Sequence, residues 1–454
     1  MSISPARRAA YRVIKRVRER EAFGPQTLDA VLTAAHLSPG DTALATRLTY
    51  GTLQTQSVLD EAIDRVTDKP GAIEPQVRDA LRIATYELLF MRTPARAAVH
   101  EGVELVRAAR SQAAGLANAV LRKVAASVDT FPWGDPDTDM DALARLTAHP
   151  RWMVDLFVAE MGEEDARLTL AADNESAPLY MWHDPFCGSR VEALDALTAD
   201  GADPIEGFLP GCIEAKAPAA AVRGAAVREH LVEITDASAQ LAAWAIGAHP
   251  GEVVVDLAAG RGTKTLQLQA LSVAAGKPAN LFTVDIHAFK SEVLKGRMVA
   301  LGVPGVTVLT GDATDVAGID RLPRSGKADA VLLDAPCTGL GTLRRHPEKR
   351  WRVTPESIAG LAELQVSLLE QAASLVRVGG VVVYSTCTVA RAENHDVVAG
   401  FLASEAGEGF VTRVPVTELP DELSGWVGPE GWFQSQPRTG GPDGHFVAAL
   451  VRVR

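Results

Sequence analysis

The sequence predicts an α/β doubly wound domain with a mostly parallel sheet in its C-terminal half, preceded by an all-α bundle and a small α/β connecting domain. Up to about residue 128, apolar side chains recur at helical spacing and alternating strand patterns are few. From about residue 236, short apolar β-rich runs alternate with helical segments, which is typical of a doubly wound sheet. The pattern between these two parts is mixed. The predicted domains are residues 1–130, 143–235 and 236–454.

The N-terminal part is predicted to be a helical bundle. Pairs of Gly and Pro at Gly24-Pro25, Pro39-Gly40 and Pro70-Gly71 separate its periodic segments. Such short breaks between amphipathic segments are typical of an all-α bundle. The apolar positions at helical spacing are Ala10, Val13, Ile14 and Val17, and then Ala80, Leu81, Ala84, Leu88 and Leu89.

A linker is predicted at residues 129–142, DTFPWGDPDTDMDA, because this stretch is rich in Pro, Asp and Gly. The following residues, 143–235, contain a helical pattern in LFVAEMG and a short strand pattern in LVEIT. We therefore predict a small connecting domain of mixed α/β structure.

The C-terminal part repeats one pattern, in which an apolar run ends in a polar or otherwise unusual residue. A helical segment, SIAGLAELQVSLLEQAASLV, separates two of these runs. Because ligands of parallel sheets bind outside the carboxyl ends of the strands, the unusual residues are expected to meet at one edge. The four runs are EVVVDLAAG, LFTVDIH, ADAVLLDAPC and GGVVVYSTCT.

Charge is distributed unevenly along the 454 residues, whose net charge is −12. Residues 1–130 carry 18 Lys and Arg against 14 Asp and Glu, whereas the remaining residues carry 27 against 43. A polyanion would therefore meet the N-terminal domain and local basic patches. An ordinary solvated helical surface is an equally good explanation of the charge alone.

Several classes of protein are disfavoured. No apolar stretch is long enough for a membrane helix, and the basic N-terminus lacks the apolar region of a secretory signal. The four cysteines form no C-x-x-C pair, so no zinc ribbon or other metal site is expected. Few cysteines without a secretory signal predict a reducing, cytoplasmic location with no membrane partner.

A glycine-containing loop is a candidate cofactor site, because it follows a strand and opens a helix. Small residues let a ligand approach the backbone closely, although such a loop can bind a dinucleotide, a methyl donor or nothing. Its spacing does not fit the phosphate loop of kinases and ATPases, and G-x-G-x-x-G is absent, which disfavours nicotinamide chemistry. The candidate residues are Ala258, Ala259, Gly260, Arg261, Gly262, Thr263 and Lys264, directly after Asp256-Leu257.

Acidic residues at strand ends accompany this loop. Asp285 ends the next predicted strand and could accept hydrogen bonds from ribose hydroxyls. Asp312 follows the strand-like VTVL and could accept from an adenine amino group. Each acid alone could be a helix cap or a loop carboxylate, but the set is more specific than any member.

Two cysteines also follow predicted strands. Cys337 lies in Asp334-Ala335-Pro336-Cys337, and Cys387 follows the strand VVVY. Structural cysteines are usually buried small hydrophobes, which is the interpretation we give to Cys187 and Cys212. Cys337 and Cys387 are instead expected on the ligand side of the sheet, where thiols can act as nucleophiles.

A basic segment follows the first of these cysteines. Cations clustered with an aromatic residue suit phosphate contact and base stacking, although a charged surface loop is the simpler explanation. Its candidate RNA-binding residues are Arg344, Arg345, His346, Lys349, Arg350 and Trp351.

At DAPCTGLGTLRRHPEKRW and YSTCT the sequence resembles the RsmB/Sun family of ribosomal RNA cytosine-5 methyltransferases, over nearly the whole chain. The resemblance implies a Rossmann-like methyltransferase domain that binds S-adenosylmethionine at Ala258–Lys264, Asp285, Asp312 and Asp334. It implies that Cys387 is the nucleophile and that Cys337 assists product release. Glu393-Asn394 and the closing GGPDGHFVAAL are also similar.

The resemblance extends to the N-terminal part, which looks like a NusB-type RNA-binding domain in ARRAAYRVIKRV, LRIATYELLFM and LANAVLRKV. Asn118 and Arg122 lie one helical turn apart and could contact RNA, or merely solvate the bundle. The implied partner is small-subunit ribosomal RNA, and we expect a monomer.

The carbon-5 chemistry explains the need for a thiol. A thiolate that adds to carbon 6 of cytosine makes carbon 5 nucleophilic, and a base must later remove the carbon-5 proton. Asp334 could stabilise this adduct near ring nitrogen 3, or could face the cofactor.

The sequence departs from the family pattern at three places and leaves alternatives open. Arg261 replaces a proline of the cofactor loop, YMWHD at 180–184 replaces an Arg-x-Asn segment, and Thr235 replaces a glutamine. The alternatives are a cytosine-5 methyltransferase of DNA or another RNA, with Cys337 as the nucleophile for DNA, and a non-catalytic RNA-binding scaffold.

Overall fold

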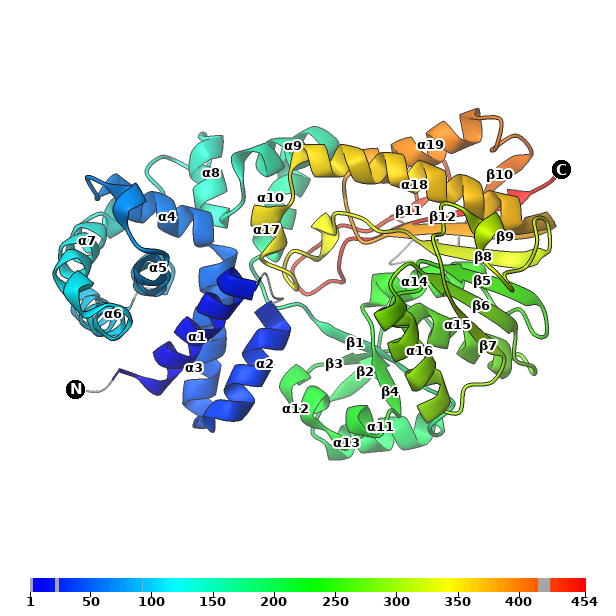
Figure 1. Cartoon of the computed structure of the whole chain (residues 1–454), viewed down its shortest axis with the longest axis horizontal. Coiled ribbons are helices and arrows are strands. Elements are labelled where there is room, and N and C mark those ends of the chain that lie inside the picture. The colour runs from blue at the N-terminus through cyan, green and yellow to red at the C-terminus, as the bar shows by residue number, and fades with distance from the viewer. Residues whose placement is uncertain (1–2, 21–23, 92, 415–424) are drawn as a thin grey trace. The chain divides into compact units, whose positions relative to one another are not determined.

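The computed structural model describes residues 3–20, 24–91, 93–414 and 425–454 (Figure 1). The chain divides into two compact units. The helical unit comprises residues 1–174 together with 343–352, and the sheet unit comprises residues 175–342 together with 353–454. Within the described ranges, no helix is both long and apolar enough to cross a membrane.

The helical unit is all-α, as predicted. Ser38 accepts a hydrogen bond from the Asp41 amide and begins α3, and Asp139 caps α8 in the same way through Asp141. Its helices are α1 Pro5–Arg20, α2 Gly24–Ala35, α3 Pro39–Gln54, α4 Gln56–Arg65, α5 Pro75–Leu89, α6 Ala95–Ala109, α7 Ala114–Ala126, α8 Met140–Thr147, α9 Arg151–Met161, α10 Glu163–Ala172 and α17 Lys349–Arg352.

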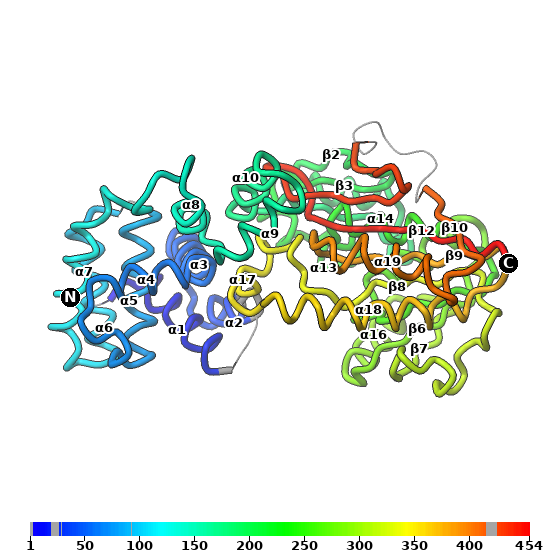
Figure 2. The backbone as a smooth tube through the Cα atoms, turned by 90° about the horizontal axis from the view of Figure 1, so that it is seen from above, coloured from blue at the N-terminus to red at the C-terminus, as the bar shows by residue number. Residues whose placement is uncertain are grey.

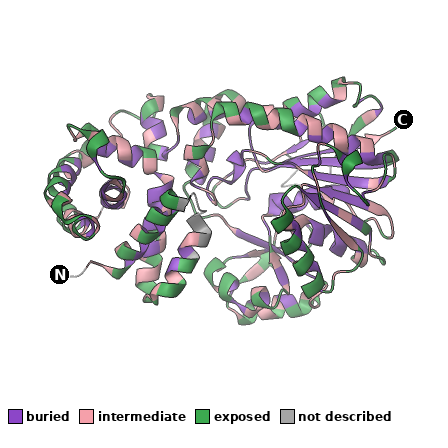
Figure 3. Ribbon diagram, in the orientation of Figure 1, coloured by how far each residue is buried: buried purple, intermediate pink, exposed green. Residues whose placement is uncertain are grey.

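Helix α5 is the core of this unit. It contacts α1, α3, α4, α6 and α7, and nearly all of its length is buried (Figure 3). Both predicted apolar stripes, the one from Ala10 to Val17 and the one from Ala80 to Leu89, belong to this core. The helical spacing of the sequence therefore identified the buried faces of α1 and α5 correctly.

The predicted linker and the domain boundary after it differ from the structure. Phe131 and Trp133 pack against the core of the helical unit, with ring centroids 5.3 Å apart. Helices α8 to α10 also belong to the helical unit, so the boundary falls after Asn174 and not near residue 143. The linker prediction relied on the Pro- and Asp-rich composition of this stretch. It overlooked that Phe131 and Trp133 could pack against the core.

A small antiparallel sheet begins the sheet unit and corresponds to the predicted connecting domain. Its strand order is β2-β3-β1-β4, and the segment YMWHD lies in and directly after β1. Cys212 is buried in β3, and burial raises the pKa of its thiol to about 12, as suits a structural cysteine. The elements are β1 Leu179–His183, α11 Arg190–Ala199, β2 Pro204–Glu206, β3 Cys212–Ala215, α12 Pro218–Arg223, α13 Ala225–Arg228 and β4 Val232–Ile234.

The large sheet is doubly wound, as predicted. Strands β5 to β9 are parallel, in the order β9-β8-β5-β6-β7. Strand β12 pairs antiparallel with β9, and β10 pairs antiparallel with β12 at the edge of the sheet. The elements are α14 Ala237–Ile246, β5 Val253–Leu257, α15 Thr263–Ala274, β6 Asn280–Asp285, α16 Ala288–Ala300, β7 Val306–Thr310, β8 Ala328–Asp334, α18 Pro355–Leu375, β9 Val376–Thr386, α19 His395–Ala403, β10 Phe410–Arg413, β11 Phe433–Gln434 and β12 Phe446–Arg452.

Helices cover both faces of this sheet. Helices α18 and α19 lie side by side on one face, over Val255 and Leu257 of β5 (Figure 2). Helix α14 packs on the other face, over Val254. Alternate residues of one strand therefore enter opposite cores, which is why the predicted strands are continuously apolar.

Candidate active site

The two cysteines that follow β8 and β9 meet at the carboxyl edge of the sheet. Strands β8 and β9 are parallel neighbours, with Asp334 paired to Ser385. The Sγ atoms of Cys337 and Cys387 are 3.4 Å apart, and the Cys387 amide donates a hydrogen bond to Cys337 Sγ at 3.3 Å. Both are free thiols that are partly exposed, so the structure brings together the pair that the sequence singled out.

A buried carboxylate holds the loop that carries Cys337. Glu393 is fully buried and accepts hydrogen bonds from the Thr338 amide, at 2.9 Å, and from the Thr338 hydroxyl. Gln365 of α18 donates to Glu393 Oε2 at 3.0 Å and to the Pro336 carbonyl at 2.8 Å. Because these bonds flank Cys337 on both sides, they fix the backbone from which its thiol emerges.

The neighbouring Asn394 holds the other loop. Its amide donates to the Thr388 carbonyl at 2.9 Å and its Oδ1 accepts from the Thr386 hydroxyl at 2.5 Å. These contacts bracket Cys387. The sequence drew attention to Glu393-Asn394 only through family resemblance, and Gln365 was missed because nothing in an amphipathic helix marks one buried amide.

The predicted cofactor loop joins β5 to α15. Its backbone has positive φ angles, which residues other than glycine rarely adopt. Ala258, Gly260 and Gly262 have φ values of 59°, 61° and 84°. A Cβ at Gly262 would lie 2.7 Å from the side chain of Leu294, so glycine is required there for conformational and steric reasons. Open space surrounds Gly260, which leaves the loop backbone accessible to a ligand.

The predicted acids lie at the same edge. Asp285 ends β6, and its carboxylate accepts hydrogen bonds from the Gly260 amide at 3.0 Å and the His287 amide at 2.8 Å. Asp312 follows β7, is exposed, and accepts from the amide and hydroxyl of Thr314, which lowers the pKa of its carboxyl. These residues fit a nucleoside cofactor, because carboxylates accept hydrogen bonds from ribose hydroxyls and amino groups.

Lys264 makes a contact that the sequence did not predict. Its ammonium donates to Asp334 Oδ2 at 2.7 Å. Burial acts to lower the pKa of Lys264, but the negative charges of Asp334 and Cys387 outweigh it and raise that pKa overall. The Lys264 ammonium therefore interacts electrostatically with both the strand-end acid and the Cys387 thiol.

Asp256 lies inside the sheet beneath this pair. Burial raises the pKa of its carboxyl to about 7, although the Thr265 hydroxyl donates to Oδ2 at 2.5 Å. The sequence placed Asp256 at the start of the cofactor loop. Its fully buried position instead makes it a support beneath that loop.

The basic segment after Cys337 corrects one prediction. Arg350 is fully buried in the helical unit, with relative exposure of 0%. Its guanidinium donates to the carbonyls of Thr147 at 3.3 Å, Ala148 at 3.1 Å and Asp173 at 2.6 Å, and to Asn174 Oδ1 at 2.8 Å. Burial lowers the pKa of Arg350 to about 10, so it remains charged. The prediction that Arg350 contacts RNA is wrong for this structure, because its side chain is fully buried and both terminal nitrogens donate to other parts of the protein.

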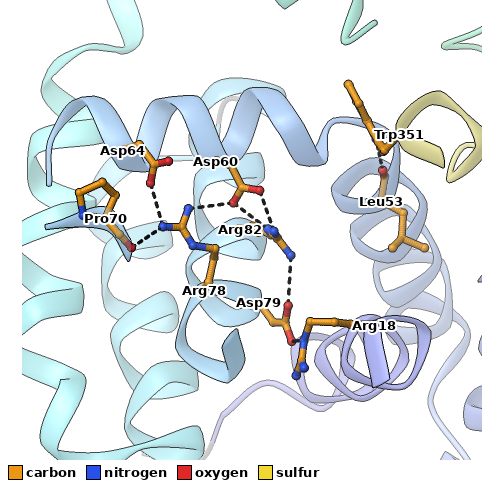
Figure 4. Close-up of polar contacts among 9 residues, drawn as sticks. All are labelled: Arg18, Leu53, Asp60, Asp64, Pro70, Arg78, Asp79, Arg82 and Trp351. Carbon is orange, nitrogen blue, oxygen red and sulfur yellow. Dashed lines mark hydrogen bonds and ion pairs between the residues drawn. The ribbon is translucent and has the colours of Figure 1, made fainter. Parts of the chain in front are cut away.

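Trp351 also anchors this segment. Its indole N–H donates to the Leu53 carbonyl at 2.9 Å (Figure 4). Arg344 is buried as well, whereas Arg345, His346 and Lys349 are half-buried. RNA binding by those three stays a prediction. Asn118 and Arg122 are exposed on α7 of the helical unit.

A partly buried network of ion pairs stabilises the helical unit. Figure 4 shows Arg82 between Asp60 and Asp79, at 2.6 and 3.2 Å, with Arg18 on the other side of Asp79 at 2.8 Å. Asp79 is fully buried, and burial raises its pKa although both arginines act against that shift. Arg18 and Arg82 form ion pairs within the protein and are therefore not candidates for RNA contact.

Comparison with known proteins matches both parts of the chain. A family model described as 16S rRNA methyltransferase RsmB/F matches residues 243–451, and a NusB family model matches residues 4–126. The chain is 34% identical to a Mycobacterium tuberculosis protein named as a methyltransferase, over 99% of this chain and 97% of that protein.

A second relative carries a more specific name. The chain is 31% identical to the ribosomal RNA small subunit methyltransferase B of Thermus thermophilus, over 94% of this chain and 92% of the relative. Among solved structures, the crystal structure of PH0851 is similar with a TM-score of 0.81 and 24% identity, covering 99% of both chains. The structural likeness supports the fold.

Proposed function

The chain belongs to the RsmB/F family of 16S rRNA methyltransferases, and from this premise we propose that it methylates carbon 5 of a cytosine in small-subunit ribosomal RNA through a covalent Cys387 adduct. It is an S-adenosylmethionine-dependent ribosomal RNA methyltransferase. The observation that carries the finer proposal is the approach of two thiols to 3.4 Å at the sheet edge that also holds the glycine loop. Carbon-5 methylation is the reaction that needs a thiol in this position.

Cys387 is the nucleophile in this proposal. Its thiolate adds to carbon 6, and the electrons of the 5,6 double bond move into the ring toward nitrogen 3. Before addition, the positive charge of the Lys264 ammonium stabilises the Cys387 thiolate, because the two groups interact electrostatically. Asp334, which accepts a hydrogen bond from the Lys264 ammonium at 2.7 Å, would relay a proton from that ammonium to nitrogen 3 and take it back when the product leaves.

Cys337 acts after methyl transfer. S-adenosylmethionine, when bound, would supply the methyl group from its positively charged sulfonium and leave as S-adenosylhomocysteine, and carbon 5 of the adduct is nucleophilic enough to accept that group. Cys337, deprotonated at this stage, takes the proton of carbon 5. The electrons of that C–H bond restore the double bond, and the bond between carbon 6 and Cys387 breaks, which releases the product.

The cofactor residues are proposed from their place around the loop. Ala258 to Lys264 would approach the cofactor through their backbone, Asp285 would accept from the ribose, and Asp312 from the adenine amino group. Arg261 is exposed, so it replaces the family's proline without displacing the loop inward.

Trapping on RNA that contains 5-azacytidine tests the role of each cysteine. A nitrogen at position 5 carries no proton for the release step, so the covalent adduct persists. We expect a stable protein–RNA adduct with wild type and with Cys337→Ala, and none with Cys387→Ala. Loss of the adduct in Cys337→Ala but not in Cys387→Ala would reverse the two roles, and Cys212→Ala serves as a control for a thiol outside the site.

Mapping 5-methylcytosine in ribosomal RNA, with and without this protein in its own cells, tests the substrate. We expect one or a few cytosines of the small-subunit RNA to lose the modification. An unchanged map would contradict the proposed substrate.

A further inference from the structure

A groove on the surface of the helical unit has the chemistry of a site for single-stranded RNA. It lies between α6 and α7, and its volume is about 1070 Å³. We call it the α6–α7 groove, and the residues that matter here are Arg96, Val99, Val103, Arg107, Asn118 and Arg122.

The groove follows from how α6 packs. Gly102 lets this helix approach its neighbours, because a Cβ there would lie 2.5 Å from Ala84 of α5 and 2.7 Å from Leu121 of α7. One flank of α6 remains facing outward beside α7. Arg96, Val99, Val103 and Arg107 recur along that flank at intervals of three to four residues, over roughly 16 Å of helix.

The charges of the groove suit a polyanion. Within the described part of the chain, the side chains of Arg96, Asn118 and Arg122 make no hydrogen bond or ion pair. All three are exposed. Arg107 pairs with Glu104, the only acid that lines the groove among the described residues. Unpaired arginines beside partly buried valines offer phosphate contacts at the rim and an apolar floor for bases.

A second hollow continues the groove. It has a volume of about 740 Å³ and shares Ala95 and Ala125 with the groove, so the two are contiguous. Phe90 and Phe131 line it, with ring centroids 5.3 Å apart, together with Leu146, which is 44% exposed. Aromatic rings next to a cationic groove are the usual platform for an unstacked base.

We propose that the α6–α7 groove and the hollow beside it bind a single-stranded segment of the substrate RNA, with phosphates on Arg96 and Arg122 and a base against Phe90 and Phe131. This inference rests on the proposed function, because it assumes an RNA substrate. An acidic peptide is the competing occupant. The aromatic rings of the hollow favour RNA, because bases can stack on them, whereas the carboxylates of an acidic peptide would make no such contact.

RNA binding by the full chain tests the groove. The probe is a fluorescently labelled oligocytidylate, and anisotropy is measured over a range of salt concentrations with Arg96→Gln/Arg122→Gln and with Leu146→Glu. For the double variant we expect a Kd raised about tenfold and a salt slope reduced by about 1.4, the share of two phosphate contacts on a single strand. Leu146→Glu should raise Kd because it adds a second negative charge to a hollow that Asp129 already lines.

Matched controls separate this site from general electrostatics. Arg223→Gln removes an exposed arginine of α12, and Leu116→Glu adds a charge at a similarly exposed leucine of α7, 41% exposed, that lines neither hollow. Both should keep the wild-type Kd. The inference is overturned if the controls weaken RNA binding as much as the lining variants do. It is also overturned if the lining variants do not weaken RNA binding.

The same assay keeps this inference distinct from the proposed function. Wild type that binds no RNA would contradict the proposed function itself. If wild type binds RNA and the variants of the lining residues bind it with the same Kd, only the proposed role of the groove is contradicted. Displacement of the probe by a polyglutamate peptide at equal charge concentration, from wild type but not from the double variant, would overturn the inference in favour of an acidic peptide.

Discussion

Glu393 holds Thr338 through two hydrogen bonds, one from the backbone amide at 2.9 Å and one from the hydroxyl, although 55 residues separate them. Thr338 follows Cys337 directly, so a single buried carboxylate fixes one of the two reactive loops. Gln365 adds a third donor to the same carboxylate.

Removing the Glu393 carboxylate should slow catalysis more than it weakens RNA binding. Glu393→Ala leaves buried donors of Thr338 and Gln365 unpaired, which costs about 1–3 kcal/mol of stability. Displacement of the Cys337 loop should lower kcat by up to about a hundredfold. Glu393→Gln, which keeps one acceptor oxygen, should recover part of both.

Methylation kinetics and thermal unfolding measure these effects, with exposed Glu405→Ala as the control. An unchanged kcat in a folded Glu393→Ala protein would show that this contact does not position Cys337.

Lys264→Met should slow formation of the Cys387 adduct. The substitution removes the cation that shares the charges of Asp334 and Cys387, so less thiolate is present at neutral pH. We expect at least about a tenfold lower trapping rate on 5-azacytidine RNA, partly recovered at higher pH. Lys277→Met, at an exposed position on the same unit, is the control. A wild-type trapping rate would contradict a role of Lys264 in activating the thiol.

Asp256 should make stability depend on pH. Its carboxyl has a pKa of about 7 in the folded protein and an ordinary value near 3.8 when unfolded. Because the folded pKa is raised, the native state binds the proton more tightly. The favourable contribution of this proton is complete below about pH 3.8 and is lost as pH rises to about 7. The whole effect amounts to no more than about 4 kcal/mol.

Asp256→Asn tests this dependence, because the amide keeps an acceptor for the Thr265 hydroxyl without a charge. The free energy of unfolding of wild type, relative to Asp256→Asn, should fall from pH 4 to pH 7 and then level off. Exposed Asp320→Asn should show no such trend. A pH-independent difference between wild type and Asp256→Asn would contradict the raised pKa.

Arg350→Ala should destabilise the helical unit. It leaves the Ala148 carbonyl without its buried donor, whereas the carbonyls of Thr147 and Asp173 keep donors from Asn174 and Gln54, and we expect a loss of about 1–3 kcal/mol. Arg352→Ala, two residues away and exposed, should have little effect. Denaturant unfolding of the full chain measures both. A stable Arg350→Ala protein whose RNA binding shows a reduced salt slope would restore the original prediction of a phosphate contact.

The fold class, and the edge of the sheet at which the site forms, could both be predicted from the amino-acid sequence. Apolar periodicity identified the buried faces of α1 and α5, and the strand-end residues Asp285, Asp334 and Cys387 followed from the rule that parallel strands share a carboxyl edge. These features are local, or depend only on topology.

The pairing of polar groups, in contrast, could not be predicted from the sequence. Arg350 looked like its basic neighbours in the chain, but it donates to Thr147, 203 residues away, and is therefore structural. The contacts of Lys264 with Asp334 and of Glu393 with Thr338 likewise join residues far apart. Such pairings depend on which side chains packing removes from water, because a buried charge or donor must find a partner. The spacing of residues along the chain therefore does not predict these pairings.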